Sequence, residues 1–268
     1  MKHLLVFVYA IMTCLATEAQ TKFVDTWIYN DVSLSRDGRQ DSLKAMVDTG
    51  CSFCVIDSAY AVRTWGISEA DYIKGGKGKK QNFVLLDSIR FCGKAYPRVY
   101  CMIMDVAGKS VDYAPRFIVG GNILIRGAWK FDLANNSVEA CDIKRKPTGN
   151  VIHWAYSRKA VNSILLKCKI DGRKMRFLFD TGAQHCKLPQ GFMTGTVERV
   201  RKESADIEHR LQMVDAKLTR GVHFRIGKHD FEHDFFDGKY NHGLLNAYSL
   251  GGTALIVNYK RKTLEIIP

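Results

Sequence analysis

Hydrophobic and polar residues alternate over short runs along most of the chain, and turn-forming residues separate these runs. Residues 23–34 alternate in this way and lead to Asp37-Gly38-Arg39, while residues 164–170 lead to Asp171-Gly172-Arg173. An Asp-Gly pair supplies the positive-φ turn of a tight β-hairpin between two such runs. Because few segments have helical periodicity, the pattern predicts an all-β fold built from short strands.

A few segments refine this expectation. Residues 58–65 are a candidate helix, and residues 83–91 and 98–104 are predicted strands. Residues 75–80 are rich in glycine and lysine and predict a flexible loop. The charged residues 198–210 fit either a hairpin arm or a helix, and the pattern alone does not separate the two.

The second half of the chain repeats the signals of the first half in the same order. After each Asp-Gly turn comes an apolar strand and then Asp-Thr-Gly, at residues 48–50 and again 132 positions later at residues 180–182. Toward the end of each half, residues 118–139 align without a gap on residues 244–265, at an offset of 126. The pattern indicates a duplicated unit. We expect two lobes, residues 20–146 and residues 147–268, joined near the basic Pro/Gly stretch 144–149 by a short exposed connection.

Residues 1–19 have the character of a signal peptide. Lys2 precedes a mostly apolar run over residues 4–15, and Thr17-Glu18-Ala19 resembles a cleavage site. The run is shorter than the roughly 20 residues of a membrane span, and no later stretch reaches that length, so no stable span is expected. The chain is therefore predicted to be exported, to a periplasm or outside the cell. Two alternatives are a buried N-terminal element and a lipoprotein signal with Cys14 lipidated, which Met12 and Thr13 fit poorly.

Composition describes a globular and strongly basic protein. The chain has 268 residues, of which 46% are hydrophobic, and a formal net charge of +13. This excess could attract anionic polymers or membrane surfaces, but no aromatic-interleaved nucleic-acid motif accompanies it. A solvated basic surface is the favoured interpretation, and no nucleic-acid partner is expected. The four tryptophans are interpreted as core or interface aromatics.

Cysteine and histidine clusters offer weaker chemistry. Seven of the eight cysteines would remain after cleavage, and an odd number excludes complete pairing; Cys92 and Cys101 could face each other across a hairpin turning near residues 96–97. Residues 51–54 have redox-dithiol spacing without the βαβ unit of such sites, so they are interpreted as two cysteines entering a core strand. His229 and His233 could be imagined as zinc ligands, but their surroundings predict strand and turn. We expect neither metal nor cofactor.

The two Asp-Thr-Gly loops are the strongest chemical signal. A carboxylate on a tight loop needs hydrogen bonds; glycine allows close approach of the backbone, and a threonine hydroxyl can bridge to a neighbouring loop. If the loops meet, Asp48 and Asp180 come within hydrogen-bonding range, and two carboxylates at that separation share one proton. One carboxylate can then act as general base on a water while the other polarises a carbonyl.

These motifs resemble those of the pepsin and retropepsin-like aspartic proteases, in their single-chain bacterial form with two lobes. The resemblance covers most of residues 22–268 and rests on the two Asp-Thr-Gly loops and on Ile118-Val119-Gly120. It implies a bilobal β-barrel-like fold, a peptide or protein substrate and a monomer whose lobes pair within the chain. It also implies roles for specific residues: Asp48 and Asp180 as the catalytic pair; Thr49, Gly50, Ser52, Thr181, Gly182 and Gln184 as their support; Gly120 and Asn246 as loop support; and Gly75, Gly76 and Gly78 as a flap.

The second half departs from the pattern at two positions. Gln184 stands where the first half has Ser52, and Asn246 stands where it has Gly120. Glutamine can still donate a hydrogen bond and asparagine tolerates positive φ, so the resemblance still implies an active endopeptidase. The departures motivate an alternative, a non-catalytic module that keeps the fold and binds an extended peptide or glycan at the cell envelope.

Overall fold

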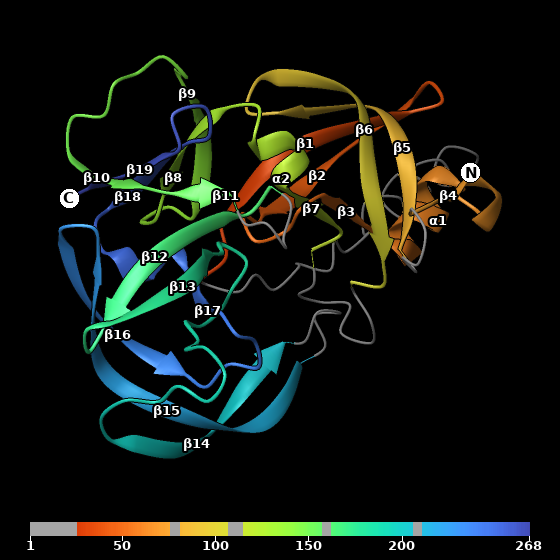
Figure 1. The fold of residues 1–268 in the computed structure, drawn as a ribbon. Helices are drawn as coiled ribbons and strands as arrows, with labels where there is room; N and C mark the ends of the chain where they lie inside the picture. The colour runs from red at the N-terminus through yellow and green to blue at the C-terminus, as the bar shows by residue number, and fades with distance from the viewer. Residues whose placement is uncertain (1–25, 76–80, 107–114, 157–161, 206–210) are drawn as a thin grey trace, which may run out of the picture.

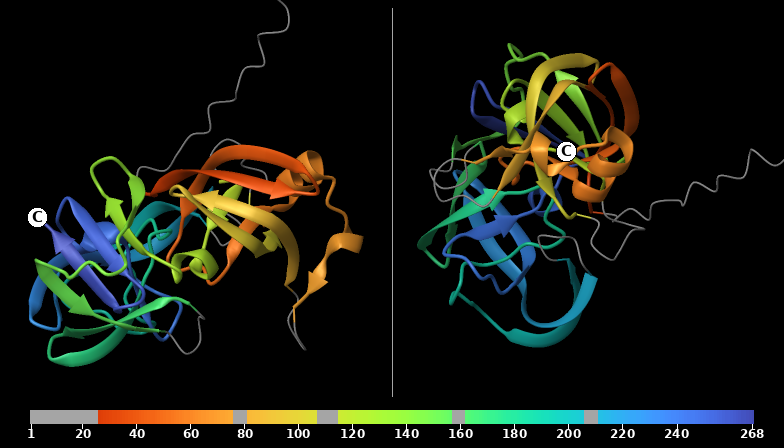
Figure 2. Two further views of the ribbon diagram at one scale, coloured as in Figure 1. Left: turned by 90° about the horizontal axis from the view of Figure 1, so that it is seen from above. Right: turned by 90° about the vertical axis from the view of Figure 1, so that its right-hand side faces the viewer.

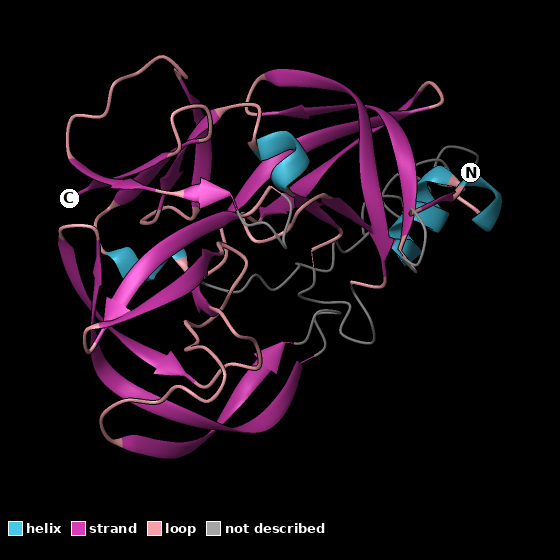
Figure 3. Cartoon of the chain, in the orientation of Figure 1, coloured by secondary structure: helices cyan, strands magenta, loops and turns pink. Residues whose placement is uncertain are grey.

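Strands dominate this computed structural model, which describes residues 26–75, 81–106, 115–156, 162–205 and 211–268. The described residues form nineteen β-strands and only short helices, so the fold is all-β (Figure 3). The predicted signal peptide, Cys14, Gly76 and Gly78 lie outside the described residues. Among the helices in these ranges, none has the length and apolar character that crossing a membrane requires.

The first half contains nine strands and three short helices, and Figure 1 labels the strands, α1 and α2. They are β1 (Tyr29–Arg36), β2 (Arg39–Val47), β3 (Cys54–Asp57), α1 (Ser58–Trp65), η1 (Glu69–Asp71), β4 (Ile73–Lys74), β5 (Asn82–Phe91), β6 (Lys94–Met104), β7 (Phe117–Val119), α2 (Gly121–Leu124), β8 (Ala128–Asp132) and β9 (Ser137–Cys141).

The second half contains ten strands and one 3₁₀ helix. They are β10 (Asn150–His153), β11 (Ala155–Tyr156), β12 (Ile164–Ile170), β13 (Arg173–Phe179), β14 (Val197–Ala205), β15 (Leu211–Ile226), β16 (His229–Phe236), β17 (Gly243–Leu245), η2 (Ala247–Leu250), β18 (Ala254–Asn258) and β19 (Thr263–Ile267). The candidate helix at residues 58–65 is confirmed as α1, and residues 197–205 form a hairpin arm rather than a helix.

Both predicted Asp-Gly hairpins are confirmed. Asp37 and Gly38 have φ of 51° and 74° between β1 and β2, and Asp171 and Gly172 have φ of 49° and 76° between β12 and β13. Two successive positive-φ residues suit the twist of a two-residue hairpin. Each hairpin delivers its second strand directly to an Asp-Thr-Gly loop.

A twelve-stranded sheet joins the two halves. In the order β10-β19-β18-β8-β9-β1-β2-β7-β3-β6-β5-β4, second-half strands lie beside first-half strands where β18 pairs antiparallel with β8. Lys130 is directly opposite Ile256, and these two residues occupy the same position of the repeat at the offset of 126. An antiparallel pair centred on equivalent residues has a local two-fold axis. The duplicated units therefore meet here as symmetric partners.

A second sheet belongs to the second half alone. Its seven strands follow the order β14-β15-β12-β13-β17, with β11 beside β12 and β16 beside β15. The long β14–β15 hairpin curves along one side of the molecule (Figures 1 and 2).

In the first half, β4 and β5 form a smaller hairpin, with the Gly75 amide bonded to the Gln81 carbonyl at 2.9 Å. Of the flap candidates, only Gly75 falls in the described residues, and it lies at the end of this hairpin.

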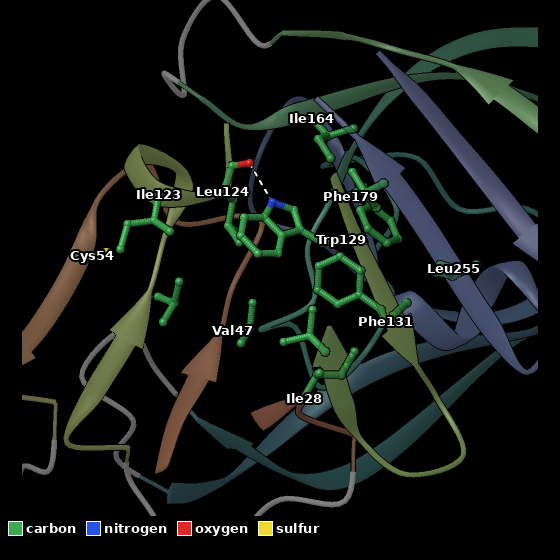
Figure 4. Packing of buried hydrophobic residues seen from close by; sticks show 14 of the residues in the cluster. Ile28, Val47, Cys54, Ile123, Leu124, Trp129, Phe131, Ile164, Phe179 and Leu255 are labelled. Atoms are coloured by element: carbon green, nitrogen blue, oxygen red, sulfur yellow. Dashed lines mark hydrogen bonds between the residues drawn. The ribbon is translucent and has the colours of Figure 1, made fainter. Parts of the chain in front are cut away.

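Aromatic and aliphatic side chains from both halves pack into one large core (Figure 4). Trp129 on β8 is fully buried and donates its indole N–H to the Leu124 carbonyl at 2.7 Å. Ile28 and Val47 of the first half belong to the same cluster as Phe179 of the second. All four tryptophans, Trp27, Trp65, Trp129 and Trp154, are buried, as expected for core aromatics.

Two sequence-based interpretations need correction. The hairpin between β5 and β6 turns at Cys92 and Gly93, not near residues 96–97, so Cys101 lies opposite Val84 and a Cys92–Cys101 bridge across the hairpin is wrong. The seven cysteines of the described residues are free thiols.

The connection over residues 144–149 is exposed in part, but it is also anchored: the Glu265 carboxylate pairs with Arg145 and accepts the backbone N–H of Thr148 at 2.7 Å.

Candidate active site

The same strand arrangement places each Asp-Thr-Gly loop. Strand β2 runs parallel to β7, and the Asp48 amide donates to the Val119 carbonyl at 3.0 Å. Strand β13 runs parallel to β17, and the Asp180 amide donates to the Leu245 carbonyl at 2.9 Å. Each aspartate therefore sits at the end of a buried strand, held by a second strand that arrives much later in the chain.

The two threonines clasp the loops together. The Thr49 amide donates to Thr181 Oγ1 at 3.0 Å, and the Thr181 amide donates to Thr49 Oγ1 at 3.1 Å. Each hydroxyl then donates across the interface, from Thr49 to the Phe179 carbonyl at 2.8 Å and from Thr181 to the Val47 carbonyl at 2.6 Å. Both threonines are buried. Four bonds from two residues thus fix the separation of the loops.

Each carboxyl group lies over the glycine of the opposite loop. A Cβ added to Gly50 would stand 2.5 Å from Asp180 Cγ, and one added to Gly182 would stand 2.7 Å from Asp48 Cγ. No side chain fits at either position, which explains why both loops end in glycine. The two carboxyl groups are close enough to hydrogen-bond with each other. The structure therefore brings together two acids that are 132 residues apart in the chain.

Backbone N–H groups hold the outer face of each carboxyl. Asp48 Oδ1 accepts from Gly50 at 2.6 Å and from Cys51 at 3.1 Å, and Asp180 Oδ1 accepts from Gly182 at 2.9 Å. Ser52 was expected to orient Asp48, but no hydrogen bond joins its hydroxyl to that carboxylate within the described residues. The Ser52 carbonyl instead accepts from Asn162 Nδ2 at 3.2 Å.

Burial and mutual repulsion favour a shared proton. Burial, followed by the charge of Asp180, raises the pKa of Asp48 well above its ordinary value. Burial also raises the pKa of Asp180, while the hydrogen bond with Asp48, the amides of Gly182 and Ala183 and, least, the charge of Lys187 act in the opposite direction. Two adjacent carboxylates in such a site cannot both ionise cheaply. The environment therefore favours one proton shared by the coupled pair.

The departures in the second half are structurally accommodated. Asn246 has φ of −78°, so its position does not need the positive φ that the sequence argument allowed for. Its side chain caps η2 by accepting the Ser249 amide at 3.0 Å, and its Nδ2 donates to the Gln184 carbonyl at 3.4 Å. In the first half, a Cβ on Gly120 would stand 2.1 Å from the Phe53 carbonyl oxygen, so close approach explains this glycine.

Two buried thiols support the loops in a way that motif reasoning missed. Cys54 Sγ accepts the Gly120 amide at 3.5 Å, and Cys186 Sγ accepts the Asn246 amide at 3.3 Å. Cys54 and Cys186 each lie six residues after the aspartate of their half. This equal spacing is present in the sequence, but spacing alone does not indicate that the two thiols accept backbone amides.

Two alternative sites, a redox pair at Cys51 and Cys54 and a zinc site at His229 and His233, receive little support from the structure. Cys54 begins strand β3, and burial followed by the charge of Asp48 raises the pKa of Cys51 well above its ordinary value, which disfavours the thiolate that redox chemistry needs. His229 and His233 lie on strand β16, as the surrounding residues predict. Within the described ranges, no group of three or more His, Cys, Asp or Glu side chains is placed to hold a metal ion.

Comparison with known proteins adds no assignment. No protein-family model matches the chain, and no curated protein matches it. Function therefore has to be argued from the site itself.

Proposed function

We propose that this chain is an aspartic-type endopeptidase in which Asp48 and Asp180 activate a water molecule against a peptide bond. The observation that supports this most is the paired carboxyl groups, each over the opposite glycine and locked by the threonine clasp. A bilobal fold of the pepsin and retropepsin kind belongs to the same proposal. The two-fold pairing of β8 with β18 and the repeated strand arrangement at both loops support it.

The two aspartates have different starting roles in this mechanism. The Asp180 carboxylate takes a proton from water as the water oxygen bonds to the carbonyl carbon, while Asp48 gives its proton to the carbonyl oxygen. The resulting gem-diol collapses when the C–N bond breaks. Asp180 then donates the proton it took to the leaving nitrogen, and Asp48 recovers a proton from the diol. Both carboxyl groups return to their first state, with no metal and no covalent intermediate in the sequence of steps.

A non-catalytic binding module is the rival proposal. It rests on Gln184 and Asn246 and would be favoured by two aspartates lying far apart. The paired carboxyl groups and the cap that Asn246 forms on η2 take support away from it. We further propose that the protein is exported and acts as a monomer, since both loops come from one chain.

Isosteric substitution of either acid tests the proposal. Purified protein is expected to cleave a mixture of synthetic peptides and to be inhibited by a statine-type transition-state mimic. Asp48→Asn and Asp180→Asn should each reduce kcat/KM by at least about 10³-fold, because one carboxyl cannot supply both the acid and the base. Asp31→Asn, an exposed aspartate on β1, is the matched control and should retain full activity. Full activity in either dyad variant would refute the mechanism.

A further inference from the structure

The two sides of the aspartate pair differ in charge. At the repeat offset of 132, Val55 of the first half corresponds to Lys187 of the second, one residue after the equivalent thiols Cys54 and Cys186. Val55 is buried in an apolar cluster with Met46 and Ile118. At this position of the repeat, the half that carries Asp48 therefore has an aliphatic side chain and the half that carries Asp180 has a lysine.

Lys187 lies between two strands, one of which, β17, also holds the Asp180 amide through Leu245. Its backbone forms isolated bridges with Leu244, the strand β17 residue next to Leu245, and with Phe236 at the end of β16. The charges of Lys187 and Asp180 interact, although no ion pair joins them within the described residues. Burial lowers the pKa of Lys187, so its ammonium group loses solvation that the protein does not fully replace.

A second lysine, Lys202 on β14, reaches Phe236, the residue that the Lys187 backbone also contacts. The Nζ of Lys202 lies 3.6 Å from the centre of the Phe236 ring, is shielded from solvent and has no hydrogen-bond partner among the described residues. Burial, followed by the charge of Lys187, lowers the pKa of Lys202 to about 8. Asp237 attracts both lysines but is itself exposed.

The burial of these two lysines costs free energy of folding unless an anion binds to them. A shielded ammonium with three unused donors loses free energy relative to water, and a second cation nearby adds repulsion. The ring of Phe236 offsets only part of this cost. A substrate carboxylate that reached Lys187 and Lys202 would give both lysines charge-assisted hydrogen bonds.

We propose that Lys187 and Lys202 form a subsite for an acidic side chain of the substrate, so that the enzyme cleaves peptides that carry Asp or Glu on the second-half side of the aspartate pair. This inference rests on the proposed peptidase function and names its substrate class.

The direct test compares peptides that differ in one charge. A set of synthetic peptides with Glu or Gln at one position at a time is digested by the wild type and by Lys187→Gln, Lys202→Gln and Lys217→Gln, and the products are quantified by mass spectrometry. The wild type should prefer Glu over Gln by about tenfold at one position, which equals about 1.4 kcal/mol. Lys187→Gln and Lys202→Gln should each remove most of this preference. Lys217, exposed on the same hairpin, is the matched control and should leave the preference intact.

The outcomes separate the subsite from the peptidase activity. Cleavage with equal use of Glu and Gln at every position overturns the subsite and leaves hydrolysis standing. If no peptide is cut, hydrolysis is refuted, and affinity selection of the same peptides on immobilised Asp48→Asn protein decides the subsite. Enrichment of Glu peptides that Lys202→Gln abolishes supports it, and absence of enrichment overturns it.

Two further readouts distinguish binding from a purely structural role. If Lys202 is kept for a ligand, Lys202→Met should leave Tm unchanged or raise it by about 2–4 °C, because it removes a poorly solvated cation. A fall in Tm by that amount would indicate a structural role and contradict the proposal. In Lys187→Gln, the acidic limb of the kcat/KM profile should move to higher pH, since Asp180 loses the cation that favours its charge.

Discussion

The chemical difference between Asp48 and Asp180 comes from their neighbours, because the two residues share the same local sequence. Both follow an apolar strand and precede Thr-Gly, and both are held by backbone amides. Among the described residues, burial raises the pKa of Asp180, the hydrogen bond with Asp48 and the amides of Gly182 and Ala183 lower it, and the charge of Lys187 adds to this lowering. On the Asp48 side, the position equivalent to Lys187 is the buried Val55.

The raised pKa of Asp48 makes a prediction about stability. A group whose pKa is raised on folding stabilises the protein below its unfolded pKa and loses that contribution as the pH rises through the folded value. Asp48→Asn should therefore stabilise the protein at neutral pH by about 1–3 kcal/mol, the usual size of a single-residue effect. The gain should vanish as the pH falls to about 4. Urea unfolding as a function of pH measures this, and a pH-independent difference would contradict the burial argument.

At the scale of elements, the connection between the halves, residues 144–149, is held in place by one buried carboxylate. We call this connection the strap. Glu265 on β19 is almost completely buried, and its carboxylate pairs with Arg145 and accepts the amides of Thr148 and Gly149. Hydrogen bonds and the Arg145 charge outweigh the effect of burial and lower the pKa of Glu265 to about 2. A strap held in this way fixes where the second half begins relative to the central sheet.

The strap should therefore be acid-sensitive. A pKa lowered from 4.5 to about 2 contributes about 3 kcal/mol, fully present above pH 4.5 and lost as the pH falls toward 2. Glu265→Gln should destabilise the protein by about this amount at neutral pH, and the difference should shrink below pH 4.5. Glu139→Gln, which removes the exposed partner of Lys130, is the control and should cost less than about 1 kcal/mol. An equal cost for both variants in urea unfolding would refute the anchoring role.

At the scale of the whole molecule, the site depends on the sheet that joins the halves. The strands β8 and β18 pair along their full length, and their inner side chains enter one core with Val47 and Phe179, which precede the two aspartates. Damage to this strand pair should therefore reach both loops even though neither β8 nor β18 carries a residue of the site.

Leu255 on β18 offers the test. Its side chain is fully buried, and its backbone lies opposite Phe131. Leu255→Ala should lower the free energy of unfolding by about 2–5 kcal/mol through lost burial and a residual cavity. Because the core is shared, hydrogen exchange should accelerate at the amides of Asp48 and Asp180 alike. Acceleration confined to the second half would show that the halves unfold independently.

The sequence alone predicted the all-β class and the two Asp-Gly hairpins, and it indicated the internal repeat and the residues proposed for the site, because alternation, turn chemistry and internal repetition can be read along the chain. It did not determine the anchoring of residues 144–149 by Glu265 or the hydrogen bonds of the Cys54 and Cys186 thiols, since each depends on a partner from a distant segment. Only the tertiary structure placed Lys187 and Lys202 at the same aromatic residue, Phe236. Charge and burial act through space, and the chain order of these residues does not record their separation.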